Sequence, residues 1–184
     1  MTKYIVLLIA ICSFLACNES IKKPENTEFI SDTVTQAAVF NDLIKLTNNS
    51  IEEINLKDSM AFLILPVKLS CPACRKKTID SIVKHQNNMP DRHIVIISAA
   101  EGIKNIRSYF EEQHKELPVI KNQLFLDSTH QAYKYKLVKE NPVIFYALHQ
   151  KVYKKVLAIP ATVKDDLCDF FSGPQDFKPQ NDNR

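Results

Sequence analysis

Three short and almost purely apolar runs constrain the fold of this chain more than any other feature. They cover Met60–Leu65, His93–Ser98 and Pro142–Leu148. Runs of this length without polar alternation are typical of strands that are buried on both faces of a sheet. Pro66 ends the first run, and a turn at Asn87–Asp91 precedes the second. The chain therefore predicts a central sheet with helices packed on both faces.

Segments with the apolar spacing of amphipathic helices separate and flank these runs. The predicted helices are Val34–Leu46, Cys71–Gln86, Gly102–His114, Gln131–Val138 and Ala161–Phe171. Gln123–Leu126 is predicted to be a further short strand. Lys151–Leu157 is expected to form an edge strand, joined to Pro142–Leu148 as a hairpin by a tight turn at His149-Gln150. Together these elements predict an α/β fold with a mixed sheet.

The N-terminus has the features of a processing signal. Met1–Lys3 carries one positive charge, and Tyr4–Ala16 is almost purely apolar. This apolar stretch has the length of a signal-peptide core and is shorter than the roughly 20 residues of a membrane-spanning helix. It ends at Phe14-Leu15-Ala16-Cys17 and then turns polar at once. This ending resembles the lipobox of bacterial lipoproteins.

The lipobox resemblance implies that Cys17 is acylated and becomes the mature N-terminus. The alternatives are a plain secretory signal cleaved near Ala16 and an uncleaved anchor. Each of these interpretations places the domain outside the cytoplasm, in the cell envelope, facing the periplasm or the exterior. The expected organisation is a signal peptide over 1–16, a flexible tether over 17–36, a domain over 37–172 and a polar tail over 173–184.

Charge and glycine content exclude several classes of function. The chain has 24 basic and 21 acidic residues, which gives a formal net charge of +3. This small and evenly spread excess argues against a nucleic-acid partner. The only 2 glycines are Gly102 and Gly173, so that a glycine-rich phosphate-binding loop is excluded.

Cys71-Pro72-Ala73-Cys74 lies where the first buried run gives way to a helix. A cysteine at a helix N-terminus is close to unpaired N–H groups, which favour the reactive thiolate. Pro72 suits the first helical position, and Arg75-Lys76-Lys77 adds positive charge. Cys74 follows one turn later, within reach of Cys71. We therefore expect Cys71 to attack client disulfides and Cys74 to resolve the mixed disulfide.

The region from about Met60 to Phe171 resembles thioredoxin-like proteins of the TlpA or redoxin type. The strand–CxxC–helix unit, Asn141-Pro142 directly before an apolar strand, and the final hairpin and helix carry this resemblance. It implies a three-layer thioredoxin-like fold. It also implies that the Asn141–Pro142 bond is cis, that Pro142 packs beside Cys71, and that this loop binds substrate.

The function expected from these features is that of an extracytoplasmic, membrane-anchored thiol–disulfide oxidoreductase. Its partners would be client proteins with thiols or disulfides, a redox partner that recharges the CxxC pair, and the membrane through the lipid anchor. No cofactor and no metal ion are expected. The alternative is a redox-inactive thioredoxin-like lipoprotein that acts as a partner-binding module.

Other interpretations of the cysteines remain open. The pair could be an inert structural disulfide or half of a zinc site, although the histidines lack partner spacing. Two thiols and a histidine would suit Cu(I), but Sco-type copper proteins separate their cysteines by three residues instead of two. Cys168, next to Leu167 in the last predicted helix, is expected to be a buried apolar residue.

Overall fold

A computed structural model of the chain describes residues 25–51, 56 and 58–173. The predicted signal peptide, Cys17 and all of the predicted polar tail except Gly173 lie outside these residues. Within them, no helix combines the length and the apolar character needed to cross a bilayer.

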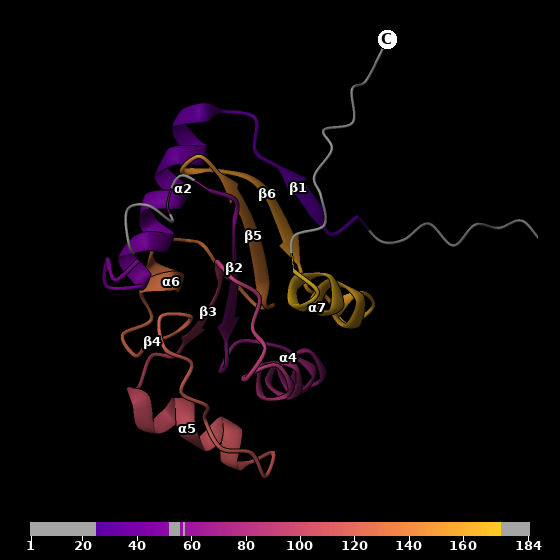
Figure 1. Ribbon diagram of the computed structural model, residues 1–184. Coiled ribbons are helices and arrows are strands. Elements are labelled where there is room, and N and C mark those ends of the chain that lie inside the picture. Colours follow the sequence, from indigo (N-terminus) through magenta and orange to yellow (C-terminus); the bar gives the residue numbers. More distant parts are fainter. Residues whose placement is uncertain (1–24, 52–55, 57, 174–184) are drawn as a thin grey trace, which may run out of the picture.

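A six-stranded mixed sheet forms the centre of the domain (Figure 1). The strands are β1 (Thr27–Phe29), β2 (Met60–Pro66), β3 (His93–Ser98), β4 (Leu124–Asp127), β5 (Val143–Leu148) and β6 (Lys151–Leu157). They lie in the order β1-β6-β5-β2-β3-β4. The neighbours β2, β3 and β4 are parallel, whereas β5, β6 and β1 each pair antiparallel with the previous strand in the sheet. The predicted mixed sheet is confirmed.

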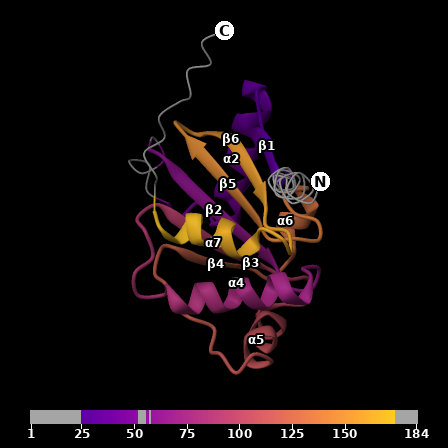
Figure 2. The ribbon, with the colours of Figure 1, turned by 90° about the vertical axis from the view of Figure 1, so that its right-hand side faces the viewer.

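Helices cover both faces of this sheet. They are α2 (Thr33–Leu46), α4 (Pro72–Lys84), α5 (Ile103–Glu111), α6 (Gln131–Lys134) and α7 (Val163–Phe171). Helices α4 and α7 cross one face, as Figure 2 shows, and α2 and α6 lie on the other (Figure 1). The order of strand, helix, parallel strand, antiparallel hairpin and final helix is consistent with the thioredoxin-like fold. The predicted three-layer α/β architecture is thus confirmed.

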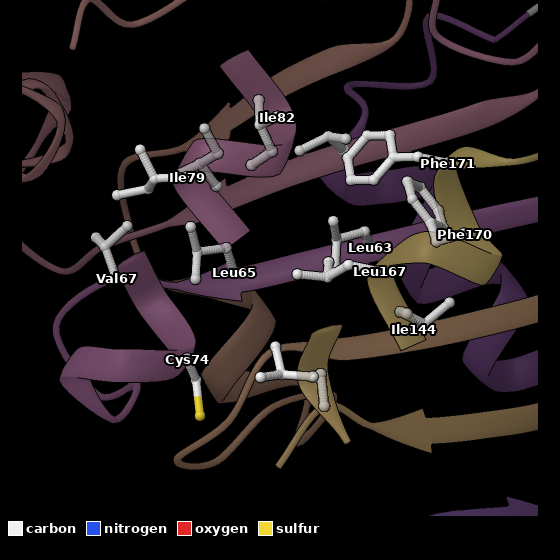
Figure 3. Packing of buried hydrophobic residues seen from close by; sticks show 14 of the residues in the cluster. Leu63, Leu65, Val67, Cys74, Ile79, Ile82, Ile144, Leu167, Phe170 and Phe171 are labelled. Carbon is white, nitrogen blue, oxygen red and sulfur yellow. The ribbon is translucent and has the colours of Figure 1, made fainter. Parts of the chain in front are cut away.

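The central strand β2 supplies both halves of the core. Its seven residues are all buried, and alternate side chains point to opposite faces. Leu63 and Leu65 pack under α4 and α7 (Figure 3), whereas Phe62 and Ile64 pack toward α2 and α6. A strand that is apolar on both faces needs a layer on each side, so the β2 sequence dictates the three layers.

The N-terminal boundary of the domain differs from the prediction. Residues 26–36, assigned to a flexible tether, contain β1 and the start of α2, and β1 pairs with β6. Consequently β6 lies inside the sheet, and its predicted position at the edge is wrong. Strand β1 has only three residues, and Phe29 is 72% exposed. Backbone hydrogen bonds to β6, and not the burial of its side chains, keep this strand in the sheet. Its sequence therefore has no apolar periodicity.

Asn26 fastens this strand to the rest of the domain. Its side-chain Nδ2 lies 2.9 Å from each of Leu157 O, Thr162 Oγ1 and Asp166 Oδ2, and its two hydrogens are shared among these three acceptors. Both Asn26 and Asp166 are buried. The amide therefore joins β1, the end of β6 and the first turn of α7.

We expect Asn26→Ala to lower the free energy of unfolding by about 2 kcal/mol, because a buried carboxylate and a hydroxyl lose a donor. Urea denaturation of the oxidised protein measures this change. Asn41→Ala, at an exposed position of α2, is the matched control and should change stability by no more than about 0.5 kcal/mol. Equal effects of the two substitutions would contradict the role given to Asn26.

His93 makes the stability depend on pH. The residue is 5% exposed, and its ring packs edge-on against Phe170, with centroids 5.0 Å apart. Burial lowers the pKa of His93 below its ordinary value, although a hydrogen bond with Asp91 O opposes this shift. The unfolded chain therefore takes up this proton at a higher pH than the folded protein does. The His93 contribution to stability is complete above the unfolded pKa and declines as the pH falls below it.

Acid titration of the unfolding free energy tests this account. Stability should fall below about pH 6.5 by at most about 1.4 kcal/mol per pH unit for this group. His93→Phe should flatten the fall, while His149→Asn, in the exposed turn between β5 and β6, should leave it as in the wild type. If the His93→Phe protein loses stability as steeply as wild type, other groups cause the loss.

Candidate functional site

The two cysteines lie where β2 ends and α4 begins, as the sequence predicted. Cys71 is the N-cap residue of α4, and Pro72 occupies the first turn. Cys71 and Cys74 form a disulfide, with their Cα atoms 5.2 Å apart. The pair follows the carboxyl end of β2. In α/β proteins, functional groups commonly lie at the carboxyl ends of the parallel strands.

The Cys71 sulfur caps the helix. Cys71 Sγ accepts a hydrogen bond from the backbone N–H of Cys74 at 3.0 Å. The first N–H groups of a helix have no intrahelical partner and carry the positive end of the helix dipole. A negative charge on this sulfur, which arises after reduction, is thus stabilised by a donor that is already in place.

The two sulfurs differ in exposure. The Cys74 side chain is fully buried, at 0% exposed, and belongs to the apolar cluster under α4 and α7 (Figure 3). Cys71 is only partly buried, and Pro72 and Ala73 beside it are exposed. An incoming disulfide or thiol therefore reaches Cys71 first. The predicted order of exposure agrees with the structure.

Arg75 has a structural role that was not predicted from the sequence. Its guanidinium donates to Val67 O at 2.9 Å and stacks on the Tyr109 ring, 4.6 Å from the centroid. It thereby joins α4 to the segment that leaves β2 and to α5. Lys76, by contrast, pairs with Asp80 on the exposed side of α4. The Tyr109 contact comes from tertiary packing, so charge patterning alone gave no signal for it.

Asn141 lies beside Cys74, whereas the expected packing of Pro142 beside Cys71 stays a prediction. Asn141 Oδ1 is 3.9 Å from Cys74 Sγ. A groove of about 310 Å³ extends from Asn141 past Leu137 to Leu157, at the end of β6. Lys136, Lys139, Glu140 and Lys155 also line this groove, so its charge is mainly positive.

The expected cis geometry is wrong, because the described residues contain no cis peptide bond and Asn141–Pro142 is trans. Trans is the intrinsically preferred isomer even before proline. Pro142 lies just before β5, where its missing N–H costs no ladder bond. Its carbonyl accepts from the Ala158 N–H at 2.9 Å, which ties the trans segment to the chain after β6.

Cys168 also differs from its prediction. It lies on the exposed side of α7 as a free cysteine, whereas Leu167 and Phe170 of the same helix are buried. The apolar neighbours in sequence were misleading because adjacent positions of a helix face different directions.

The described residues contain no cluster of three or more His, Cys, Asp or Glu side chains that could hold a metal ion. A small cavity of about 90 Å³ lies at the opposite ends of β2 and β3, lined in part by Met60, His93 and Tyr146. It is separated from the cysteines by the length of the strands, so it plays no part in their chemistry.

Comparisons with known proteins add little to this picture. No model of a protein family matches the chain, and no curated protein matches it. Among solved structures, a DsbF homologue from Corynebacterium diphtheriae is similar at 13% sequence identity and a TM-score of 0.36. The alignment covers 61% of this chain and 71% of that one. A likeness this low carries no functional argument.

We expect Arg75→Ala to lower the free energy of unfolding by about 1–2 kcal/mol, because Val67 O loses a donor and the stacking on Tyr109 is lost. Urea denaturation of the oxidised protein measures the loss. Lys77→Ala removes a charge from an exposed position of the same helix and is the control. If both variants are equally stable, the Arg75 contacts do not hold this part of the site together.

Proposed function

We propose that this protein is a thiol–disulfide oxidoreductase that is anchored outside the cytoplasm through Cys17. The observation that carries the redox part is the asymmetry of the disulfide. Cys71 is partly exposed and its sulfur caps a helix, while Cys74, one turn later, is fully buried. An inert structural disulfide has no need for an accessible sulfur with a donor in place.

The exchange conserves atoms and electrons. In the reducing direction, the Cys71 thiolate attacks a client disulfide, forms a mixed disulfide and releases one client thiolate. Cys74 then loses its proton and attacks the Cys71 sulfur, which restores the Cys71–Cys74 bond and releases the second client thiol. In the oxidising direction a client thiolate attacks Cys71 and the same steps run in reverse. A second protein with a dithiol or a disulfide recharges the pair.

The groove beside Asn141 supports a macromolecular client. Asn141, whose Oδ1 is 3.9 Å from Cys74 Sγ, lines it together with the 136–140 segment and the end of β6. An extended client segment in this groove would bring its sulfur to Cys71, and its excess of lysines favours acidic or neutral client segments.

Thiol-exchange assays with single cysteine variants test the redox proposal. Every protein in the test carries Cys168→Ser, because this exposed thiol would otherwise react by itself. Alkylation of the reduced protein at mildly acidic pH should label Cys71 before Cys74. Cys71→Ser should abolish exchange with a disulfide-bonded client, and Cys74→Ser should stall it as a mixed disulfide that is visible by non-reducing electrophoresis.

The Cys168→Ser protein with Cys71 and Cys74 intact is the control, and it should exchange disulfides with the client. Equal and slow labelling of Cys71 and Cys74, without exchange activity, would instead identify a redox-inactive binding module.

The anchor needs a separate experiment. The lipobox-like Phe14-Leu15-Ala16-Cys17 leads us to expect that Cys17→Ala prevents acylation. The variant should lose the lipid mass and change its membrane fractionation, while Cys12→Ala, within the apolar run, should keep both. A wild-type protein without lipid and with an intact bond between residues 16 and 17 would overturn the lipoprotein interpretation.

A further inference from the structure

We infer that Asn141 stabilises the reduced form of the cysteine pair and so biases the protein toward donating its disulfide to clients. This inference deepens the proposed function, on which it depends. It starts from a contact between a polar side chain and a buried sulfur: Asn141 Oδ1 lies 3.9 Å from Cys74 Sγ.

The contact differs between the two redox states. A disulfide sulfur has no hydrogen, so in the oxidised protein the amide oxygen receives no hydrogen bond from Cys74. Reduction gives Cys74 an S–H group at the position that faces this oxygen, and a thiol is a weak donor. The hydrogen bond therefore exists in the reduced protein only. An interaction made in one state alone shifts the equilibrium toward that state.

Burial strengthens this effect. Cys74 is 0% exposed, so water does not compete for its S–H group. The rest of its environment is an apolar cluster that includes Leu65, Val67 and Ile79. In surroundings of low polarity a hydrogen bond is electrostatically stronger than in water. The amide oxygen thus gives the buried thiol a partner that the apolar core does not supply.

The second sulfur acts in the same direction. Cys71 Sγ accepts the N–H of Cys74 at 3.0 Å, and this bond becomes charge-assisted once the sulfur is a thiolate. Both cysteines thus gain interactions on reduction. A pair whose reduced form is stabilised is a stronger oxidant than an unsupported pair.

The favoured reaction is balanced. A client dithiol gives two electrons and two protons to the protein disulfide, which becomes the Cys71 and Cys74 thiols, and the client becomes a disulfide. The Cys71 thiol then ionises, while Cys74 keeps its proton in the bond to Asn141. A disulfide-bearing partner protein must oxidise the pair again, so the inferred recharging partner is an oxidant.

Equilibrium with glutathione measures this bias. The full chain with Cys168→Ser is equilibrated at neutral pH in mixtures of reduced and oxidised glutathione, acid-quenched and alkylated. Mass spectrometry then gives the reduced fraction. Asn141→Ala should shift the equilibrium constant about two- to fivefold toward the oxidised protein, because a weak hydrogen bond is lost. Asn141→Leu, which keeps about the same side-chain size but has no acceptor, should shift it in the same direction and by a similar factor.

Similar shifts in a truncated and a size-matched variant, with unchanged unfolding free energies of the oxidised proteins, separate this role from a structural one, since a packing defect would affect Asn141→Ala more than Asn141→Leu. Asn41→Ala, the same substitution at an exposed position of α2 on the other face of the sheet, is the control and should match the parent protein. If the parent equilibrates with glutathione but Asn141→Ala matches it, or Asn141→Leu matches the parent, the inference is wrong while the proposed function stands. If the parent pair does not equilibrate with glutathione at all, both are wrong.

Discussion

The burial of β2 on both faces is the constraint on which the rest of the structure depends. Its seven residues contribute to both halves of the core, so the strand can lie only in the middle of a covered sheet. Its parallel neighbour β3 and antiparallel neighbour β5 then fix which end of the sheet receives the chain after Pro66. Helix α4 must begin at that end, and its first residues are the cysteines.

Much of this arrangement could be predicted from the sequence. The runs that became β2, β3 and β5 are apolar enough to identify buried strands, and the helices between them follow from apolar spacing. The wrong predictions concern features that depend on tertiary contacts and not on a local sequence pattern. Strand β1 is held in place by its pairing with β6 and by the hydrogen bonds of the Asn26 amide. Neither interaction produces a recognisable pattern in the sequence around β1.

In the candidate site, too, the local features were predicted and those that depend on tertiary contacts were not. Cys71 and Cys74 are recognisable because a helix N-cap and its first turn are local, and Asn141 was found because it directly precedes a buried strand. The trans bond before Pro142, the exposure of Cys168 and the stacking of Arg75 on Tyr109 were not predictable. Each depends on how elements distant in sequence meet.

Two chemically identical residues become different through their positions in a single helical turn. At the N-cap, Cys71 is partly exposed and its sulfur meets a free backbone donor, which favours the charged form. Three residues later the chain has entered the helix, and the side chain of Cys74 turns toward the apolar layer above β2. There a charge is costly, and the nearby Asn141 oxygen suits a protonated sulfur. The asymmetry on which directed thiol exchange depends thus arises from the same packing that makes β2 central, since that packing determines which side of α4 faces the core.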